Sequence, residues 1–380
     1  MLRRLLARLS LGNPLIEVGI SKSALLHNLH TYQRAYPGIA IAPVLKSNAY
    51  GHDMGLVART LDAENIAFFM VDSLYEARRL RAAGIRSRIL VMGYVRPEDI
   101  ACSTLARVDF AITDIDQLRV LSESVTSAVR IHLKLDTGMH RQGILPKDLQ
   151  TAIQYISNEP LFRLVGVCSH FADADEDTSP HNESQLAVWT SAQALVEENF
   201  STIEYKHFSA TKGARFAKQA GTNVLRLGIG LYGFDTSPTG DSSLLPVLEL
   251  RSIIGELRTV PASEFVGYNA TYSTTKETVV ATIPAGYYEG VDRRLSSRGF
   301  VRVSGIVCPI IGRVSMNMVS VDVTDVPDVR VGDKVMIVDR SPDSPLSMSS
   351  IASAVSTPEY TESIYVLLAH IPQHLKRVLE

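Results

Sequence analysis

Lys46 ends an apolar segment, in a position where a charged ammonium group needs a partner or a chemical use. The preceding residues, 42–45, are typical of the end of a buried strand, and the stretch APVLKSNAYGHD continues at once into small polar residues. The position alone fits equally well with a lysine that extends to solvent. The alternative is a lysine whose pKa is lowered by burial, so that its neutral amine can form a Schiff base with a carbonyl compound.

Residues that could bind a phosphate favour the second interpretation. Tyr50 and Gly51 follow Lys46 in a short loop, Thr211 supplies a hydroxyl in HFSATKGA, and RLGIGLYG places glycines at positions 228 and 230. Glycine lets backbone N–H groups approach an anion closely. A phosphate site opposite a lysine at a strand end is suited to pyridoxal phosphate.

A repeating order of apolar segment, loop and amphipathic segment positions these residues and runs from residue 40 to about 235. The predicted strands are eight in number and lie at 41–45, 67–71, 88–92, 109–113, 130–135, 164–168, 204–208 and 224–229. Eight such units predict an α/β fold with an N-terminal (β/α)8 TIM barrel rather than an open sheet. The C-terminal ends of barrel strands meet at one opening. The residues expected to converge there are Lys46, Asp136, Arg141, His170, Thr211 and Gly228.

The pattern changes after Pro246, where short β-rich segments separated by Gly, Pro and Asp replace the alternation. This pattern predicts a C-terminal mainly-β domain. We expect the barrel domain to span residues 1–245 and the β domain residues 246–380, with a late helix at 347–356 and a final strand within 362–371.

Composition indicates an ordinary globular protein whose function lies in a local site. The chain has 380 residues, with 38 Lys plus Arg, 40 Asp plus Glu and a net charge of −2, which gives no electrostatic reason to expect a nucleic-acid or membrane partner. The three cysteines are widely spaced and form no metal-ligand motif, which favours a reducing compartment, the cytoplasm, and no structural metal. Arginines interrupt the apolar N-terminus, so we expect a short helix or frayed tail rather than a signal peptide.

Seven motifs in order resemble the alanine racemase family, the barrel-type class of pyridoxal-phosphate enzymes. They are LKSNAYGHD (45–53), HLKLDTGMHRQG (132–143), SHFADADE (169–176), NVLRLGIGLYG (223–233), GYNATYS (267–273), IPAGYYEG (283–290) and GRVSMNM (312–318). Each is weak alone, but the ordered set is highly specific. The resemblance covers about residues 15–320.

The resemblance implies a two-base racemase that supplies D-alanine for peptidoglycan. Lys46 would hold the cofactor and act as base on one face of the substrate Cα, and Tyr268 would be the opposing base. Racemisation needs both, because one base alone would usually return the proton to its original face. In this family the tyrosine reaches the active site of the other subunit, which implies a head-to-tail homodimer. Without the family match, Tyr268 would be interpreted as a core tyrosine of the β domain.

Further roles follow from the same resemblance. Arg226 would hydrogen-bond the pyridine nitrogen, and because a guanidinium keeps its proton, the ring would stay a weak electron sink. His170 would pack against the ring and orient Arg226, whereas Arg141 and the backbone N–H of Met316 would bind the substrate carboxylate. Lys134 matches a lysine that is carbamylated in some relatives, and carbamylation of Lys134 is a hypothesis for this chain. The phosphate would be bound by Tyr50, Thr211, Gly228, Ile229 and Tyr360.

The chain departs from the common family pattern on the substrate side. Where the family usually has glycine before Arg141, this chain has His140. The family pattern SMDM is replaced here by SMNM, with Asn317, and the pattern GYADG by GYYEG, with Tyr288 and Glu289. The family pattern ANS is replaced by SAT. A tyrosine that usually narrows the entrance near the C-terminus has no clear counterpart in VLLAHIPQ. Alanine is the expected substrate. Serine or a broader set of amino acids is the alternative, because one methylene is worth only about 1–3 kcal/mol of discrimination.

Two other functions are compatible with a barrel that binds pyridoxal phosphate. An amino-acid decarboxylase would need an acidic partner for the pyridine nitrogen, and Arg226 argues against it. A non-catalytic cofactor-binding protein would be a single barrel, so the segment from about 246 onward, which carries Tyr268, argues against that function.

Overall fold

The computed structural model describes residues 14–176, 178–234, 243–357 and 364–380, and these form two compact units. One unit comprises Ala24–Tyr50 and Met54–Leu245. The other comprises the described residues up to Ser23, Gly51–Asp53 and the described residues from Pro246 to Glu380. The N-terminal residues 1–13, for which a helix or frayed tail was expected, lie outside the described part of the chain.

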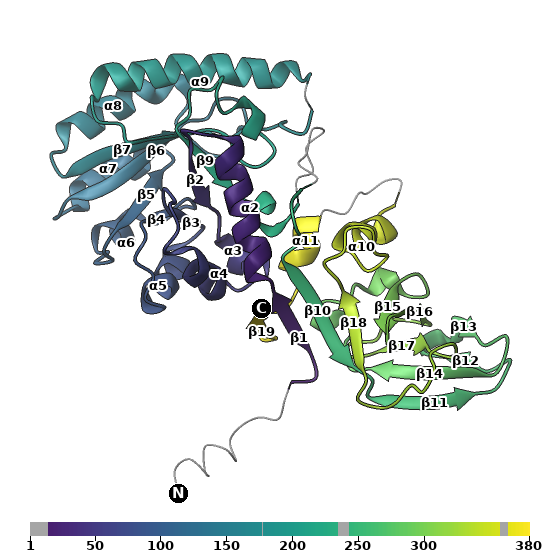
Figure 1. The fold of residues 1–380 in the computed structure, drawn as a ribbon. Coiled ribbons are helices and arrows are strands. Elements are labelled where there is room, and N and C mark those ends of the chain that lie inside the picture. The colour runs from purple at the N-terminus through teal and green to yellow at the C-terminus, as the bar shows by residue number, and fades with distance from the viewer. Residues whose placement is uncertain (1–13, 177, 235–242, 358–363) are drawn as a thin grey trace, which may run out of the picture. The chain divides into compact units, whose positions relative to one another are not determined.

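The first unit is a closed barrel of parallel strands (Figure 1). Its strands are β2 (Ala40–Pro43), β3 (Phe69–Val71), β4 (Ile89–Val91), β5 (Val108–Ile112), β6 (Val129–Lys134), β7 (Phe162–Cys168), β8 (Tyr205–His207) and β9 (Val224–Leu227). Strands β3 to β8 pair in chain order, and β2 pairs with β9. The Leu45 N–H donates to the Met70 carbonyl at 2.7 Å, and the Arg226 N–H donates to the Ser209 carbonyl at 3.2 Å. These bonds join β2 to β3 and β8 to β9, so the prediction of a (β/α)8 barrel is confirmed.

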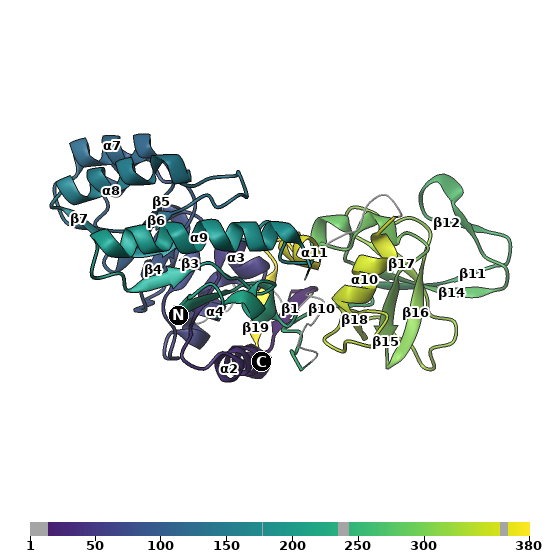
Figure 2. The same cartoon turned by 90° about the horizontal axis from the view of Figure 1, so that it is seen from above.

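Helix α2 (Lys22–Ala35) precedes the first barrel strand, and the left-handed turn α3 (Lys46–Tyr50) and helix α4 (Met54–Leu61) lie between β2 and β3. The next barrel strands up to β8 are connected in turn by α5 (Leu74–Ala82), α6 (Pro97–Ala101), α7 (Ile115–Ser124), α8 (Leu149–Asn158) and α9 (Pro180–Asn199). Between β8 and β9 lies the short turn η2 (Ala214–Phe216). Helix α5 begins at the cap Ser73, whose side chain accepts a bond from the Glu76 N–H, and Asp114 caps α7 in the same way. Helices α7, α8 and α9 contact one another in chain order, side by side on the outside of the strands (Figure 2).

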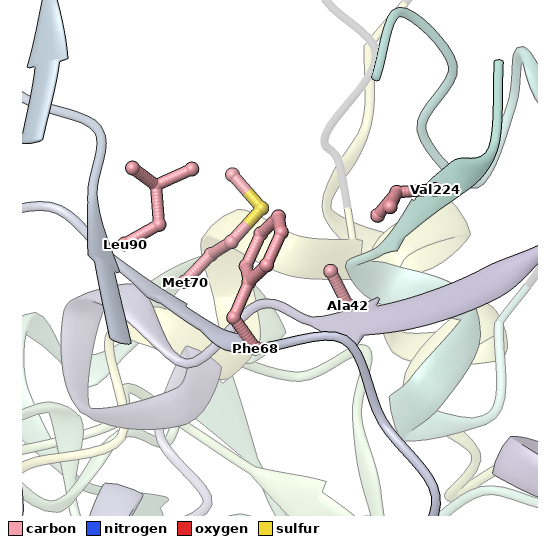
Figure 3. Close-up of a cluster of buried hydrophobic side chains, with 5 residues drawn as sticks. All are labelled: Ala42, Phe68, Met70, Leu90 and Val224. Carbon is pink, nitrogen blue, oxygen red and sulfur yellow. The ribbon is translucent and has the colours of Figure 1, made fainter. Parts of the chain in front are cut away.

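Apolar side chains from four neighbouring strands fill part of the barrel interior. Ala42 of β2, Met70 of β3, Leu90 of β4 and Val224 of β9 point toward a common centre with Phe68, which precedes β3 (Figure 3). All five are at most 5% exposed. This cluster holds together four strands, two of which, β2 and β9, carry Lys46 and Gly228 at their C-terminal ends.

A buried polar column lies beside this cluster. Asp109 and His132 are fully buried, with 3.5 Å between the Asp109 Oδ2 and the His132 Nε2, and the His132 Nδ1 lies 2.8 Å from the His207 Nε2. Burial disfavours a charged Asp109, but the adjacent His132 and the charges of Arg88 and Arg130 outweigh it and hold the pKa of the carboxyl below its usual value. Gly166 makes room for the column, since a Cβ there would lie 2.2 Å from the His132 Nδ1.

The second unit is built on a nine-stranded sheet in the order β11-β14-β17-β16-β15-β18-β10-β1-β19. Its strands are β1 (Glu17–Ile20), β10 (Leu248–Ile253), β11 (Glu256–Val260), β14 (Thr278–Ile283), β15 (Phe300–Val303), β16 (Ile306–Ile311), β17 (Val319–Asp322), β18 (Lys334–Val338) and β19 (Lys376–Leu379). Strands β12 (Phe265–Val266) and β13 (Tyr272–Ser273) form a small hairpin.

Strand β1 and the segment 362–371 differ from the sequence prediction, whereas the late helix agrees with it. Strand β1, placed in the barrel by the predicted boundary at 245, instead pairs antiparallel with β10 and parallel with β19. Helix α10 (Met348–Val355) agrees with the predicted late helix. Within 362–371, where a final strand was predicted, the described residues form helix α11 (Ile364–Ala369), and the final strand is β19. The apolar residues of IYVLLA suit either element, so their pattern did not distinguish helix from strand.

In the part of the chain that the structure describes, no helix is long and apolar enough to cross a membrane. The cysteines are all free: Cys102 is exposed, and Cys168 and Cys308 are buried.

Candidate active site

Lys46 begins a left-handed turn at the end of the first barrel strand. Ser47, Asn48, Ala49 and Tyr50 have φ values of 56°, 54°, 56° and 52°. A left-handed conformation costs roughly 1–2 kcal/mol per non-glycine residue, so the turn needs support from its surroundings. That support includes the Glu76 carboxylate, which accepts the Ser47 N–H at 2.7 Å, and the Asn48 side chain, which accepts the Met54 N–H at 3.1 Å.

The turn exposes Lys46 and returns Tyr50 toward the barrel. Lys46 is exposed, so the structure does not bury the ammonium group as the sequence pattern suggested. The Tyr50 ring packs against Tyr232 with 5.1 Å between ring centroids, and the Tyr232 hydroxyl donates to the Val44 carbonyl at 2.7 Å. Tyr50 is thereby held at the end of β2.

The residues predicted to bind phosphate converge at the ends of β8 and β9. The Thr211 hydroxyl oxygen lies 3.2 Å from the Gly228 nitrogen and 3.3 Å from the Gly230 nitrogen, and it accepts from both N–H groups. A Cβ on Gly228 would lie 3.2 Å from the Tyr50 hydroxyl, so a side chain at this position would press on Tyr50 and narrow the cradle. Ile229 begins the short turn η3 (Ile229–Tyr232). Tyr360, the fifth predicted phosphate ligand, lies outside the described residues.

Arg226 is buried in the barrel and bonded to His170. Its guanidinium lies 2.8 Å from the His170 Nδ1 and also donates to the carbonyls of Phe208 and Ser209. Burial lowers the pKa of Arg226 to about 10, so the group stays protonated at neutral pH. Desolvation and then the charge of Arg226 hold the pKa of His170 well below its usual value. His170 is therefore neutral and accepts the hydrogen bond.

Lys134 adds a buried cation to the same opening. It is 5% exposed, and burial lowers its pKa to about 8, with the charges of Arg226, Arg141 and Lys46 acting in the same direction. Only the neighbouring Cys168 thiol opposes this shift. Among the described residues, none of these four cations forms an ion pair with a carboxylate, and the Asp136 carboxylate nearby is bonded to its own loop, so the opening has an excess of positive charge.

Arg141 lies on a loop organised by Asp136. The Asp136 Oδ1 accepts the Gly138 and His140 N–H groups at 2.9 and 3.0 Å, and the Leu135–Ile144 bridge closes the loop. His140 has a φ of 51°, which explains why the common family pattern places glycine at this position. The Arg141 side chain is exposed.

Tyr268 and Met316 belong to the other compact unit, so they are described with it and not with the barrel residues. Tyr268 starts the turn η4 (Tyr268–Ala270) between β12 and β13 and is 67% exposed, and Met316 is 55% exposed. A Cβ on Gly267 would lie 3.4 Å from the Arg313 nitrogen, which places the two segments side by side. Nearby segments expose Phe265, Tyr287, Tyr288 and Met318.

The sequence interpretation missed several supporting residues. Glu76, which supports the left-handed turn, Asp109 and His207 lie outside the seven motifs, and His132 begins one of them but was given no role. For Asp109, His132 and His207 the available signal was a polar residue within a predicted strand, which marks a buried polar group that needs a partner, whereas Glu76 lies in helix α5 and had no such signal.

Comparison with known proteins identifies the family. The model of the alanine racemase N-terminal domain matches residues 20–236, and that of the alanine racemase C-terminal domain matches residues 247–378. An alanine racemase of Syntrophobacter fumaroxidans is 38% identical over 349 residues, 90% of this chain and 93% of the relative. One of Sorangium cellulosum is 35% identical over 344 residues, 88% of this chain and 90% of the relative.

Solved structures agree with these relatives. An alanine racemase from a D-cycloserine-producing Streptomyces lavendulae has a TM-score of 0.85 at 27% identity, covering 97% of each chain. Alanine racemase from Bacillus anthracis with bound L-Ala-P has a TM-score of 0.87 at 27% identity, covering 97% of this chain and 95% of that one. The chain therefore belongs to the alanine racemase family, a family of isomerases that racemise alanine.

Proposed function

We propose that this chain interconverts L- and D-alanine with pyridoxal phosphate bound at the barrel opening, using Lys46 and the Tyr268 of a second subunit as the two bases. The observation that supports this most directly is the composition of the opening. Four cations without a carboxylate partner among the described residues lie at the same end of the barrel as a cradle of hydroxyl and backbone N–H groups. Such a site suits the phosphate of a cofactor and the carboxylate of an amino-acid substrate together.

The donors present fit the phosphate and ring of that cofactor. Thr211, Gly228, Ile229 and Tyr50 would hold the phosphate, and we extend this set to Tyr360 on the family pattern. When bound, the cofactor accepts the electron pair that remains after an α-proton leaves the substrate.

The protein's own groups then determine where protons move. Arg226 would face the ring nitrogen as a donor that keeps its own proton, since its pKa of about 10 leaves it charged at neutral pH. His170 is neutral and fixes the guanidinium from the other side. The Lys46 Nζ would take or give the proton on one face of the substrate Cα, and the Tyr268 hydroxyl would do so on the opposite face. Arg141 and the Met316 N–H would bind the substrate carboxylate.

The second subunit is proposed from the exposed face of the β unit. A tyrosine 67% exposed at a hairpin end, with neighbouring exposed aromatic and methionine side chains, is costly for a monomer to leave in water. A head-to-tail homodimer would cover this face and deliver each Tyr268 to the partner's barrel.

Substrate breadth and setting are proposed from the same residues. Alanine is the proposed substrate, with serine as the alternative because the changed positions lie on the substrate side. The protein would act in the cytoplasm, where unpaired cysteines stay reduced, to supply D-alanine for peptidoglycan. The carbamylation of Lys134 fits an amine with a pKa of about 8 among cations, and high-resolution density that shows a bare ammonium would remove this hypothesis.

Mixed dimers test the proposal. Lys46→Ala and Tyr268→Phe subunits are each expected to be inactive as homodimers, whereas the mixed dimer regains one intact site. Activity is measured by chiral analysis of L-alanine and L-serine incubated in D2O, and cofactor binding by the visible absorbance of the purified protein. Deuterium-labelled D-alanine from the wild type and recovery in the mixed dimer support the proposal. Cofactor absorbance without inversion would refute racemisation, and no recovery in the mixed dimer would refute site sharing.

A further inference from the structure

Two of the positions at which the chain departs from the common family pattern are bonded to each other. The Glu289 Oε1 accepts a hydrogen bond from the Asn317 side-chain nitrogen at 2.7 Å. The Glu289 Oε2 accepts the Gly286 N–H at 2.8 Å. Glu289 is 7% exposed, so its bond with the Gly286 N–H is shielded from water, whereas Asn317 is exposed and its bond to the Glu289 carboxylate is only partly shielded.

This pair closes a contact between two backbone segments. The Tyr287 N–H donates to the Ser315 carbonyl at 3.1 Å, and the Tyr288 N–H donates to the Met316 carbonyl at 2.9 Å. Gly286 allows this approach, because a Cβ there would lie 2.3 Å from the Ser315 oxygen. Segments 286–290 and 315–318 therefore lie side by side, and the Glu289–Asn317 bond fastens their ends.

The contact fixes the direction of one N–H group. A peptide unit is planar and trans, so its C=O and N–H point in opposite directions. The Ser315 carbonyl points at Tyr287, hence the N–H of Met316 in the same peptide unit points away from segment 286–290. Among the described residues this N–H has no acceptor, and Met316 is 55% exposed. The arrangement presents a backbone donor outward and holds it there.

We infer that Glu289 and Asn317 are positioning residues that orient the Met316 N–H toward the substrate carboxylate. The inference rests on the proposed function, in which that N–H binds the carboxylate. It also explains why the two positions differ together from the common pattern. Two aspartates would put two acceptors against each other, whereas a glutamate and an asparagine form a donor–acceptor pair.

The pair is expected to act on substrate binding more than on proton transfer, because neither side chain needs to touch the reacting atoms. In the holoenzyme, Asn317→Ala should raise the KM for L-alanine about tenfold, the worth of one hydrogen bond to a charged group, with kcat changed less than about threefold. Asn317→Asp should raise KM further, since it places a carboxylate against Glu289.

Reversal of the pair supplies the decisive variant. In Glu289→Gln with Asn317→Asp, the new amide donates and the new carboxylate accepts, so KM should return to within about threefold of the wild type. Glu256→Gln is the matched control, because it removes a carboxylate from an exposed site in β11 of the same unit and should leave KM unchanged. Binding of propionate, measured by competition, should weaken in parallel with KM.

The outcomes separate the inference from the proposed function. A wild type that binds cofactor but does not racemise alanine refutes the proposed function itself. With an active wild type, three results would overturn the positioning role. The first is an unchanged KM in Asn317→Ala, and the second is a fall in kcat as large as the rise in KM. The third is a KM in the reversed pair that is no lower than in Asn317→Asp alone.

Discussion

Replacement of Lys134 by methionine should make the cofactor-free protein more stable at neutral pH. Lys134 is 5% exposed in β6, and burial among other cations lowers its pKa from 10.5 to about 8. Below pH 8 the folded protein therefore keeps a buried charge that the unfolded chain would hold in water. At about 1.4 kcal/mol per pH unit, the difference corresponds to roughly 3 kcal/mol at pH 7. Methionine has a similar length and carries no charge.

The stability difference between Lys134→Met and the wild type should also depend on pH, which gives a second test of the prediction. Between pH 8 and 10.5 the unfolded state binds more protons at this position than the folded state, so wild-type stability should rise with pH relative to Lys134→Met. The advantage of the variant should shrink from about 3 kcal/mol at pH 7 to about 1.5 kcal/mol at pH 9.5.

Urea denaturation of the cofactor-free protein in carbon-dioxide-depleted buffer, at pH 7, 8.5 and 9.5, provides the assay. A parallel series with bicarbonate reports on carbamylation, because a carbamate would replace the buried positive charge and remove the advantage of methionine. A Lys134→Met variant that is less stable than the wild type at pH 7 without bicarbonate would refute the reasoning. An advantage that does not change with pH would refute it as well.

Three other substitutions test separate parts of the barrel. Gly228→Ala should weaken cofactor binding about tenfold, because the new Cβ would lie 3.2 Å from the Tyr50 hydroxyl. Cofactor titration followed by absorbance measures this, and an unchanged far-ultraviolet circular dichroism spectrum is the control. Trp189→Phe removes the bond from the buried indole to the Ala220 carbonyl and should cost about 1–3 kcal/mol in urea denaturation, and a variant as stable as the wild type would contradict this. Burial holds the pKa of His207 well below 6.5, so the unfolded state takes up a proton that the folded state excludes. Below about pH 6.5 the free energy of unfolding should therefore fall by up to about 1.4 kcal/mol per pH unit more in the wild type than in His207→Asn. An equal fall in both proteins would contradict this.

The sequence predicted those features that depend on local pattern. All eight barrel strands were predicted near their observed positions, because each combines apolar β-rich residues with a following loop and amphipathic segment. The convergence of Thr211, Gly228 and His170 at one opening followed from their places at strand ends.

Features that depend on distant partners were not predictable in this way. Strand β1 is only four residues long and pairs with residues more than 200 positions away, so nothing in its own sequence assigns it to the β unit. The left-handed turn after Lys46 depends on a carboxylate in α5, the Glu76 side chain. The low exposure of Lys134 depends on its neighbours in the closed barrel, which alternation alone does not reveal.

The pairing of β1 with β19 sets an order for folding during synthesis. Glu17 lies opposite Lys376, so the first described strand cannot complete its place in the sheet until almost the whole chain has left the ribosome. The barrel residues 24–245 contain their own strand pairs and can close earlier. Closing a loop of this length costs conformational entropy before the strand contacts form, so the β unit is expected to fold after the barrel. Pulse labelling of nascent chains should therefore detect a protected barrel before the nine-stranded sheet is complete.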